Sequence, residues 1–444
     1  MRIIIAGAGE VGTHLAKLLS RENMDISLLD EHRERLGDLE TNYDIITRVG
    51  NSTSIHDLRD IGVKDVDLFI AVTPSETENM TACLIANQLG AKRTLARIDN
   101  YEYLIPENKQ FFEQMGLTHL IYPEVLAANE IVDSLKTNWL RNHFSLCDGA
   151  LELCVVRIRE TCKTLNMSFA SGCYSHGRYR IVAIKRDQET IIPNGEDQLQ
   201  VGDMAYCICV KENMEFMREE LGKSQREIRN IIFYGGSRIA QKAAQALPDG
   251  FNIKILEANH DEAVRLSEKL SNALIINADG SDMEVLKEEG IQDADAFVAV
   301  TESSEANIFA CLAAKRFGVR KTIAEVENID YIPMAEGLDI GAVLNKKTIT
   351  ASYIYQMLLN ASVLNVRNLT SADAQIIEFL ATENSRITKM KIKDAHLPDE
   401  ATIGALVRAG EGVLVNGETT ILPGDRVVVL SKSNVLKKLE KYFQ

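Results

Sequence analysis

Three glycines near the start of the chain have the spacing of a phosphate-binding turn. Gly7, Gly9 and Gly12 follow the apolar run at residues 3–6 and open a stretch with helical periodicity. In such a turn the first glycine permits a tight bend, the second lets the backbone approach a pyrophosphate, and the third allows close helix packing. The helix N-terminus adds N–H donors and a positive dipole end. We therefore expect an anionic ligand to be held by a turn made of Gly7, Ala8, Gly9, Glu10, Val11 and Gly12.

An acidic residue stands where this kind of site contacts a ribose. Asp30 ends the second apolar run, 18 residues after Gly12. A carboxylate there can accept hydrogen bonds from both ribose hydroxyls, and its charge would repel a 2′-phosphate. We expect NAD(H) or an adenine nucleotide rather than NADP.

Further polar residues follow the later apolar runs, at the edge where ligands of open α/β sheets bind. Asn51 lies in "GNST" after the third run, and Thr73 and Pro74 open "TPSETEN" after the fourth. The sequence leaves open whether this second segment contacts ribose or phosphate or only caps the next helix, a choice that concerns Thr73, Ser75, Glu76 and Asn79. Arg97, near the end of the fifth run, is either a phosphate clamp or part of a structural ion pair.

The chain contains a second copy of this pattern. "IIIAGAGEVGTHLAKLL" from residue 3 matches "IIFYGGSRIAQKAAQAL" from residue 231. In the second copy Ser237 replaces Gly9, which places a Cβ where a pyrophosphate would meet the backbone, and Glu325 stands where the first copy has Arg97. We expect a second site retuned toward a mononucleotide, built from Gly235, Gly236, Ser237, Arg238, Ile239, Glu257, Asp279 and Thr301.

The elements that position these residues alternate along the chain. Apolar runs separated by helical stretches predict a parallel, doubly wound α/β sheet, with strands at 3–6, 26–29, 45–49, 68–72, 94–98 and 119–122. After about residue 147 short alternating strands predict a small α+β module, and "AIKRDQETIIPNGEDQLQVGD" matches "ALVRAGEGVLVNGETTILPGD" later in the chain. The order is therefore Rossmann-like domain, small module, Rossmann-like domain, small module, with boundaries at 1–140, 141–225, 226–360 and 361–444. A helix over 122–140 is packed on its own sheet or offered to another subunit.

Composition excludes several functional classes. With 49 basic and 64 acidic residues the net charge is −15, which argues against a nucleic-acid partner. No apolar run could span a bilayer, and the N-terminus lacks the features of a signal peptide, so we expect a cytoplasmic protein. The 8 cysteines form no C-x-x-C pair and are interpreted as reduced core thiols, without a metal site.

A reaction is not evident from the residues. His14, His32, His56, His119 and His143 have no obvious partner carboxylate in the sequence, and only a small module follows each nucleotide fold. We therefore expect a binding protein without catalytic residues. The alternatives are an NAD-dependent oxidoreductase whose small modules hold the substrate, and a purely structural assembly scaffold.

Taken together, these segments resemble the TrkA family, the peripheral regulatory subunits of bacterial Trk potassium uptake systems, built of two tandem RCK (regulator of potassium conductance) units. The likeness covers the whole chain and rests on "IIIAGAGEVG", "LLD", "GNSTS", "DLFIAVTPSETENMTACLIA" and "TLARI". It implies that each unit has an RCK-N and an RCK-C domain, and that a dimer or tetrameric ring docks on the cytoplasmic face of the membrane beneath a potassium channel subunit. It also implies NAD(H), and ATP or ADP, as ligands, with Gly7, Gly9, Asp30, Thr73 and Arg97 at binding positions. Asn51 departs from the aspartate that the family often has.

Overall fold

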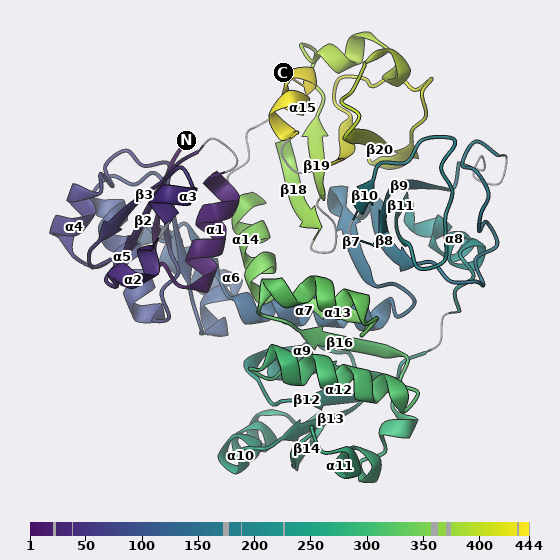
Figure 1. Cartoon of the computed structure of the whole chain (residues 1–444). Coiled ribbons are helices and arrows are strands. Elements are labelled where there is room, and N and C mark those ends of the chain that lie inside the picture. Colours follow the sequence, from purple (N-terminus) through teal and green to yellow (C-terminus); the bar gives the residue numbers. More distant parts are fainter. Residues whose placement is uncertain are drawn as a thin grey trace. The chain divides into compact units, whose positions relative to one another are not determined.

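A computed structural model describes residues 1–20, 24–37, 39–171, 177–187, 189–224, 227–356, 363–369, 374–432 and 435–443. The chain divides into two compact units (Figure 1). The first contains Met1–Leu126 and Lys346–Tyr355, and the second contains Ala127–Asn345 and Gln356–Gln444. No helix of the described residues is long and apolar enough to cross a membrane.

The first unit is built on a six-stranded parallel sheet with the order β3-β2-β1-β4-β5-β6. Every strand predicted for this half is present. Their bounds are β1 (Arg2–Ala6), β2 (Asp25–Asp30), β3 (Ile45–Val49), β4 (Leu68–Ala71), β5 (Thr94–Arg97) and β6 (His119–Ile121). The strand order reverses between β1 and β4, the point at which open α/β sheets bind ligands.

The connections of the first unit are helical, as the alternating pattern predicts. They are α1 (Glu10–Ser20), α2 (Arg33–Leu36), α3 (Leu39–Asn42), α4 (Ile55–Asp60), α5 (Glu76–Gln88), the 3₁₀ turn η1 (Tyr101–Leu104) and α6 (Pro106–Gln114). The unit also contains most of α14 (Lys346–Gln356), which comes from much later in the sequence.

The predicted helix over 122–140 is α7 (Pro123–Lys136). Pro123 opens it, because proline already has the backbone angle of a first helical residue and its missing N–H is not needed there. Ile131, Val132 and Leu135 are buried, so this apolar face packs inside the chain.

The second unit contains a parallel sheet with the same strand order as the first, β14-β13-β12-β15-β16-β17. The strands are β12 (Asn230–Tyr234), β13 (Asn252–Glu257), β14 (Ala273–Asn277), β15 (Ala296–Ala299), β16 (Lys321–Glu325) and β17 (Ala342–Leu344). The helical connections are α9 (Arg238–Ala246), α10 (His260–Lys269), α11 (Met283–Glu288), η5 (Ile291–Asp293), α12 (Ser304–Arg316), η6 (Ile329–Tyr331) and α13 (Ile332–Gly337). The repeat read from the sequence is thus a repeat of the fold.

Two five-stranded antiparallel sheets complete the second unit, and they confirm the two small modules. The first has the order β10-β9-β11-β8-β7, with β7 (Asn142–Leu146), η2 (Cys147–Gly149), β8 (Leu151–Arg157), β9 (Tyr179–Arg186), β10 (Glu189–Ile191), β11 (Met204–Cys209), η4 (Lys211–Asn213) and α8 (Met214–Glu220). The second has the order β18-β19-β22-β20-β21, with β18 (Val363–Leu369), β19 (Ala374–Leu380), η7 (Arg386–Lys389), η8 (Ile392–Asp394), β20 (Ala401–Arg408), β21 (Glu411–Leu414), β22 (Arg426–Lys432) and α15 (Leu436–Phe443).

The two small modules share one hydrophobic core. Leu153 and Ile208 of the first module belong to the same buried cluster as Ile376 and Leu430 of the second. The approach is close at Gly404, where an added Cβ would lie 2.6 Å from the Cδ1 atom of Ile208. The sequence repeat predicts two modules but not that they pack on each other.

An ion pair between a buried aspartate and a partly exposed arginine recurs at the matched "GD" segments of the two modules. Arg186 Nε donates to Asp203 Oδ1 over 2.9 Å, and Arg408 Nε donates to Asp425 Oδ1 over 2.9 Å. Both aspartates are almost fully buried, so each needs its arginine partner to offset the loss of water.

The described cysteines are all free and buried, as expected of core thiols. Burial raises the pKa of Cys311 to about 12, which keeps this thiol protonated. Cys173 lies outside the described residues. Among the residues that the structure describes there is no group of side chains that could hold a metal ion.

Candidate nucleotide-binding site

The three glycines of the first turn differ in how closely the surrounding protein packs against them. Gly7 has φ +104°, and a Cβ there would lie 3.0 Å from the backbone nitrogen of Thr73. A Cβ on Gly12 would lie 1.8 Å from the carbonyl oxygen of Gly7. These two positions need glycine for the fold itself. At Gly9 nothing lies within 4 Å of an added Cβ, so the fold does not explain this glycine.

A cleft of about 280 Å³ opens beside Gly9 at the carboxyl ends of β1 to β4. It is lined by Gly7, Gly9, Leu29, Asp30, Glu31, His32, Arg35, Gly50, Ser52, Thr73, Pro74, Ser75 and Glu78. Of the predicted site residues, Gly7, Gly9, Asp30, Thr73 and Pro74 line it, whereas Ala8, Glu10, Val11, Gly12, Asn51 and Arg97 do not. The prediction missed Glu31, His32, Arg35, Ser52 and Glu78, although most of them sit just after predicted strands.

Asp30 links the glycine turn to the end of β2. Its Oδ2 accepts from the backbone N–H of Ala8 over 2.7 Å, and its Oδ1 accepts from the N–H of His32 over 2.8 Å. Arg35 Nη1 lies 3.7 Å from Oδ2. Asp30 is only 7% exposed, so these donors hold a buried carboxylate at the wall of the cleft.

The sequence-based view that the histidines lack carboxylate partners is wrong for three of them. His32 Nδ1 lies 3.3 Å from Asp30 Oδ1, and His56 Nδ1 lies 3.3 Å from Asp57 Oδ1. His143 Nε2 lies 2.9 Å from Glu152 Oε2. The first two partners are near neighbours in sequence, and the third is reached across the β7–β8 pair.

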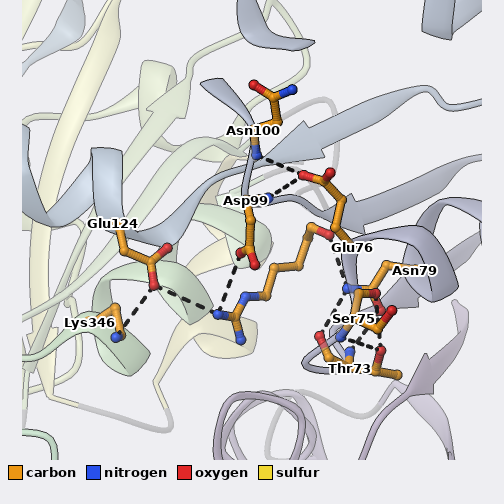
Figure 2. Close-up of polar contacts among 9 residues, drawn as sticks. Thr73, Ser75, Glu76, Asn79, Asp99, Asn100, Glu124 and Lys346 are labelled. Carbon is orange, nitrogen blue, oxygen red and sulfur yellow. Dashed lines mark hydrogen bonds and ion pairs between the residues drawn. The ribbon is translucent and has the colours of Figure 1, made fainter. Parts of the chain in front are cut away.

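Most polar residues of "TPSETEN" hold their own loop together, as Figure 2 shows. Asn79, which is 1% exposed, accepts from the N–H of Thr73 over 2.8 Å and donates to the carbonyl of Arg97 over 3.0 Å. Ser75 caps α5 by accepting from the N–H of Glu78. Ser75 is therefore the helix cap, and Asn79 bridges the loop after β4 and the end of β5.

Glu76 also has a structural partner. Its Oε2 accepts from the backbone N–H groups of Asp99 and Asn100, the latter over 2.7 Å (Figure 2). This ties the start of α5 to the loop after β5. Thr73 lines the cleft together with Pro74, Ser75 and Glu78 of the same segment, whereas Glu76 and Asn79 do not line it.

Arg97 takes part in ion pairs rather than in the cleft. Its Nη2 lies 3.7 Å from Glu124 Oε1 and 3.9 Å from Asp99 Oδ1. Lys346 Nζ of α14 lies 3.5 Å from the same Glu124 oxygen (Figure 2). The geometry supports the ion-pair alternative for Arg97.

The start of α1 is in contact with a residue from far along the chain. Glu10, the first residue of α1, is 71% exposed and pairs with Lys347 of α14, whose side chain is 8% exposed. Val11 is buried, and Gly9 offers its carbonyl to the N–H of Thr13 over 2.9 Å. The helix N-terminus beside the cleft is thus formed in this structure.

The second copy repeats the framework of the first. Gly235 has φ +97°, and a Cβ there would lie 2.9 Å from Thr301 Cγ2. Glu257 replaces Asp30, accepting from the N–H groups of Gly236 and Asn259 over 2.7 Å each. Ile239 is buried in α9, of which Arg238 is the first residue.

Two side chains change the second copy at the ligand-facing edge. Ser237 is the N-cap of α9 and accepts from the N–H of Ala240, whereas Gly9 has no side chain that could accept a hydrogen bond at the matching position. Tyr234 replaces the small Ala6, and a Cβ on Gly280 would lie 2.5 Å from Tyr234 Cδ2. Asp279 accepts from the N–H of Ser281 in the same loop.

Replacing Ser237 by alanine should destabilise α9. Loss of a serine N-cap typically costs about 1 kcal/mol, whereas Ser237→Gly should cost only a few tenths, because glycine is itself tolerated at this position. Chemical unfolding of both variants checks this. Equal losses for alanine and glycine would show that the hydroxyl is not capping the helix.

The chain matches known protein families and relatives over its length. The model of the TrkA-N domain matches residues 3–123 and 231–346, and that of the TrkA-C domain matches residues 376–444. The chain is 32% identical to the Trk system potassium uptake protein TrkA of Haemophilus influenzae over 100% of this chain and 99% of that protein. It is 30% identical to a TrkA homolog of Archaeoglobus fulgidus over 100% of both chains.

Solved structures share the fold. The GsuK RCK domain superimposes with a TM-score of 0.59 at 16% identity, covering 100% of this chain and 94% of that one. The GsuK channel bound to NAD gives a TM-score of 0.59 at 16% identity, covering 100% of this chain and 78% of that one. Both copies of the glycine-turn fold lie in the matched segments and the curated relatives match from end to end, and therefore the chain belongs to the TrkA family.

Proposed function

We propose that the chain is the cytoplasmic regulatory subunit of a Trk-type potassium uptake system, and that it binds NAD(H), with ATP or ADP as the second choice. The observation that carries this proposal is the cleft at Gly9, where the missing Cβ serves no packing purpose. The names of the relatives support the potassium uptake system, and the NAD-bound GsuK channel supports the ligand class.

The residues of the cleft fit the parts of a nucleotide. The N-terminus of α1 beside Gly9 would face the phosphates, because its N–H groups and dipole favour an anion. Asp30 would accept hydrogen bonds from the ribose, since a carboxylate accepts about four and the protein supplies two backbone N–H groups here. The positive charge of Arg35 is paired with the carboxylate of Asp30, so Arg35 is not assigned to the phosphates.

Regulation requires that the nucleotide bind two conformations unequally. Each tenfold shift in their populations needs about 1.4 kcal/mol of difference in binding free energy. The pair between Glu10 and Lys347 supports such coupling, because it joins the phosphate end of the site to a helix from the end of the second Rossmann-like segment. We propose that ligand binding shifts this contact and so moves α14.

The assembly follows from the same proposal. RCK-N and RCK-C domains would divide at 1–140, 141–225, 226–360 and 361–444. Two or more copies of the chain would form a dimer or a tetrameric ring, peripheral to the cytoplasmic face of the membrane and docked on a potassium channel subunit.

Isothermal titration of the full chain with NADH, NADPH, ATP and ADP tests the ligand. We expect NADH to bind more tightly than NADPH, because Asp30 would repel the 2′-phosphate. If none of the four nucleotides gives a heat of binding, the proposal that the chain binds a nucleotide is wrong.

The oxidoreductase alternative makes a different prediction. The full chain is incubated with NADH and a panel of carbonyl compounds while NADH absorbance is followed. We expect binding without turnover, and a steady loss of NADH that depends on the carbonyl compound would favour the enzyme.

A further inference from the structure

Four basic side chains surround one carboxylate in the second unit. Asp339 lies between α13 and β17, and Arg159 Nη2 and Lys315 Nζ each lie 3.3 Å from its Oδ2. Arg157 Nε lies 3.9 Å from Oδ1, and Arg141 pairs with the same oxygen. These five residues, with Lys223, are called the Asp339 cluster below.

Lys223 adds a further positive charge. Its Nζ donates to the carbonyl oxygen of Arg157 over 2.5 Å, at the end of β8. Burial and the neighbouring arginines lower the pKa of Lys223 to about 8 and that of Lys315 to about 8. The pKa of Arg141 falls to about 10 for the same reasons. Burial is the larger cause in each case, and the repulsion between neighbouring cations adds to it.

Among the described carboxylates, Glu336 also favours the charged form of Arg141 and raises its pKa, but no ion pair joins Glu336 to the cluster. Glu336, on α13, has its ion pair with Lys185 at 3.0 Å. One carboxylate accepts about four hydrogen bonds, far fewer than three guanidinium and two ammonium groups can donate. Such a surplus of donors and positive charge stands out in a chain whose net charge is −15.

The surplus donors can be reached from water. The side chain of Arg159 is 57% exposed, and those of Arg157 and Lys315 are 29% and 23% exposed. The cluster is thus a half-buried concentration of positive charge with an open side, the kind of environment that strengthens hydrogen bonds to an anion.

We propose that the Asp339 cluster binds a multivalent phosphate-type anion, either inorganic polyphosphate or the phosphate tail of a nucleotide. Guanidinium groups match phosphate oxygens in pairs, and a multivalent anion offsets several cations at once. This site lies in the second unit and does not depend on the glycine cleft of the first.

The anion would join two modules of the same unit. Arg141, Arg157 and Arg159 flank β7 and β8 of the first antiparallel sheet, whereas Lys315 and Asp339 belong to the second Rossmann-like segment. Bound phosphate would draw these elements together, and the junction would become more stable with the anion than without it.

Pyrophosphate titration of the full chain in a phosphate-free buffer tests the proposal. Arg159→Ala should weaken binding about tenfold, as expected for the loss of a charge-assisted hydrogen bond. The control is Arg265→Ala, because Arg265 has a similar exposure of 61% and one ion pair of its own, with Glu262. Equal affinities for the two variants would overturn the proposal, as would absence of pyrophosphate binding.

Asp339→Asn should change the affinity for pyrophosphate in the direction opposite to Arg159→Ala. Removing the carboxylate of Asp339 should tighten pyrophosphate binding and enlarge the thermal shift that pyrophosphate produces. If Asp339 is purely structural, the variant should instead be destabilised, and pyrophosphate should not restore its stability.

Orthophosphate and ATP titrations distinguish the two sources of the anion. Arg159→Ala should leave NADH binding unchanged, which separates this site from the glycine cleft, and a loss of NADH affinity would contradict the assignment.

Discussion

Gly9→Ser is expected to weaken NADH binding about 10- to 100-fold without destabilising the fold. The added atoms would overlap the position of the pyrophosphate, and overpacking of this kind typically costs about 1–3 kcal/mol. The fold has room for them, because nothing lies within 4 Å of a Cβ at this position.

Gly9→Ser should weaken NADH binding but slightly raise the free energy of unfolding. Gly9 precedes α1 and accepts from the N–H of Thr13, so a serine there can cap the helix as Ser237 caps α9. We expect a gain of a few tenths of a kcal/mol. A variant that binds ligand less well while unfolding no more easily identifies a ligand contact rather than a packing defect.

Titration calorimetry and chemical unfolding of the same preparations measure both effects. Ser237→Gly is the reciprocal control, since it removes the cap of α9 and the Cβ at the matching position of the second copy. Undiminished NADH affinity in Gly9→Ser would show that the steric argument for the divergence of the two copies is wrong.

Lys321→Met is expected to stabilise the chain at about pH 6 by about 1–4 kcal/mol, the range seen when buried ion pairs are replaced by apolar groups of similar volume. Lys321 begins β16, is 6% exposed and donates from Nζ to the carbonyl of Leu140 over 2.8 Å. Burial, with Arg141 nearby, lowers the pKa of Lys321 to about 7. Methionine has a similar length and no charge to bury.

The lowered pKa of Lys321 determines how the stability of the wild-type chain changes with pH. The folded pKa of about 7 lies below the ordinary value of 10.5, so below about pH 7 the amine is charged in both states and the fold bears the whole cost of burying it. Between these values the folded state loses the proton first, and stability rises with pH. The full shift corresponds to at most about 5 kcal/mol.

Thermal unfolding at about pH 6 and about pH 9.5 checks this for wild type and Lys321→Met. The advantage of the variant should shrink at the higher pH. Lys269→Met, at an exposed position of α10, controls for the loss of a lysine charge. An advantage that does not change with pH would mean that charge burial is not its cause.

The fold was predictable because its signals are local. Each strand of the first sheet is an apolar run, and each glycine turn follows its strand directly. Asp30 was predictable for the same reason, since strand length and turn spacing fix its place at the sheet edge. The repeat then transferred this framework to Glu257 and Gly235.

What sequence could not supply depends on contacts between distant segments. Arg97 is directed by Glu124, and Lys346 of α14 shares that carboxylate, although α14 lies more than two hundred residues later. The shared core of the small modules and the Asp339 cluster likewise join segments that lie far apart in the sequence, and no local pattern shows that they are in contact. Tertiary packing, not local periodicity, decides such positions.

Potassium flux through a Trk-type membrane subunit reconstituted in vesicles, with this chain added, tests the central claim most directly. We expect NADH or an adenine nucleotide to change the flux when the wild-type chain is present, and Gly9→Ser to require a much higher NADH concentration for the same change. Flux that is the same with and without nucleotide, under conditions where the chain is shown to bind both the nucleotide and the membrane subunit, would contradict the account.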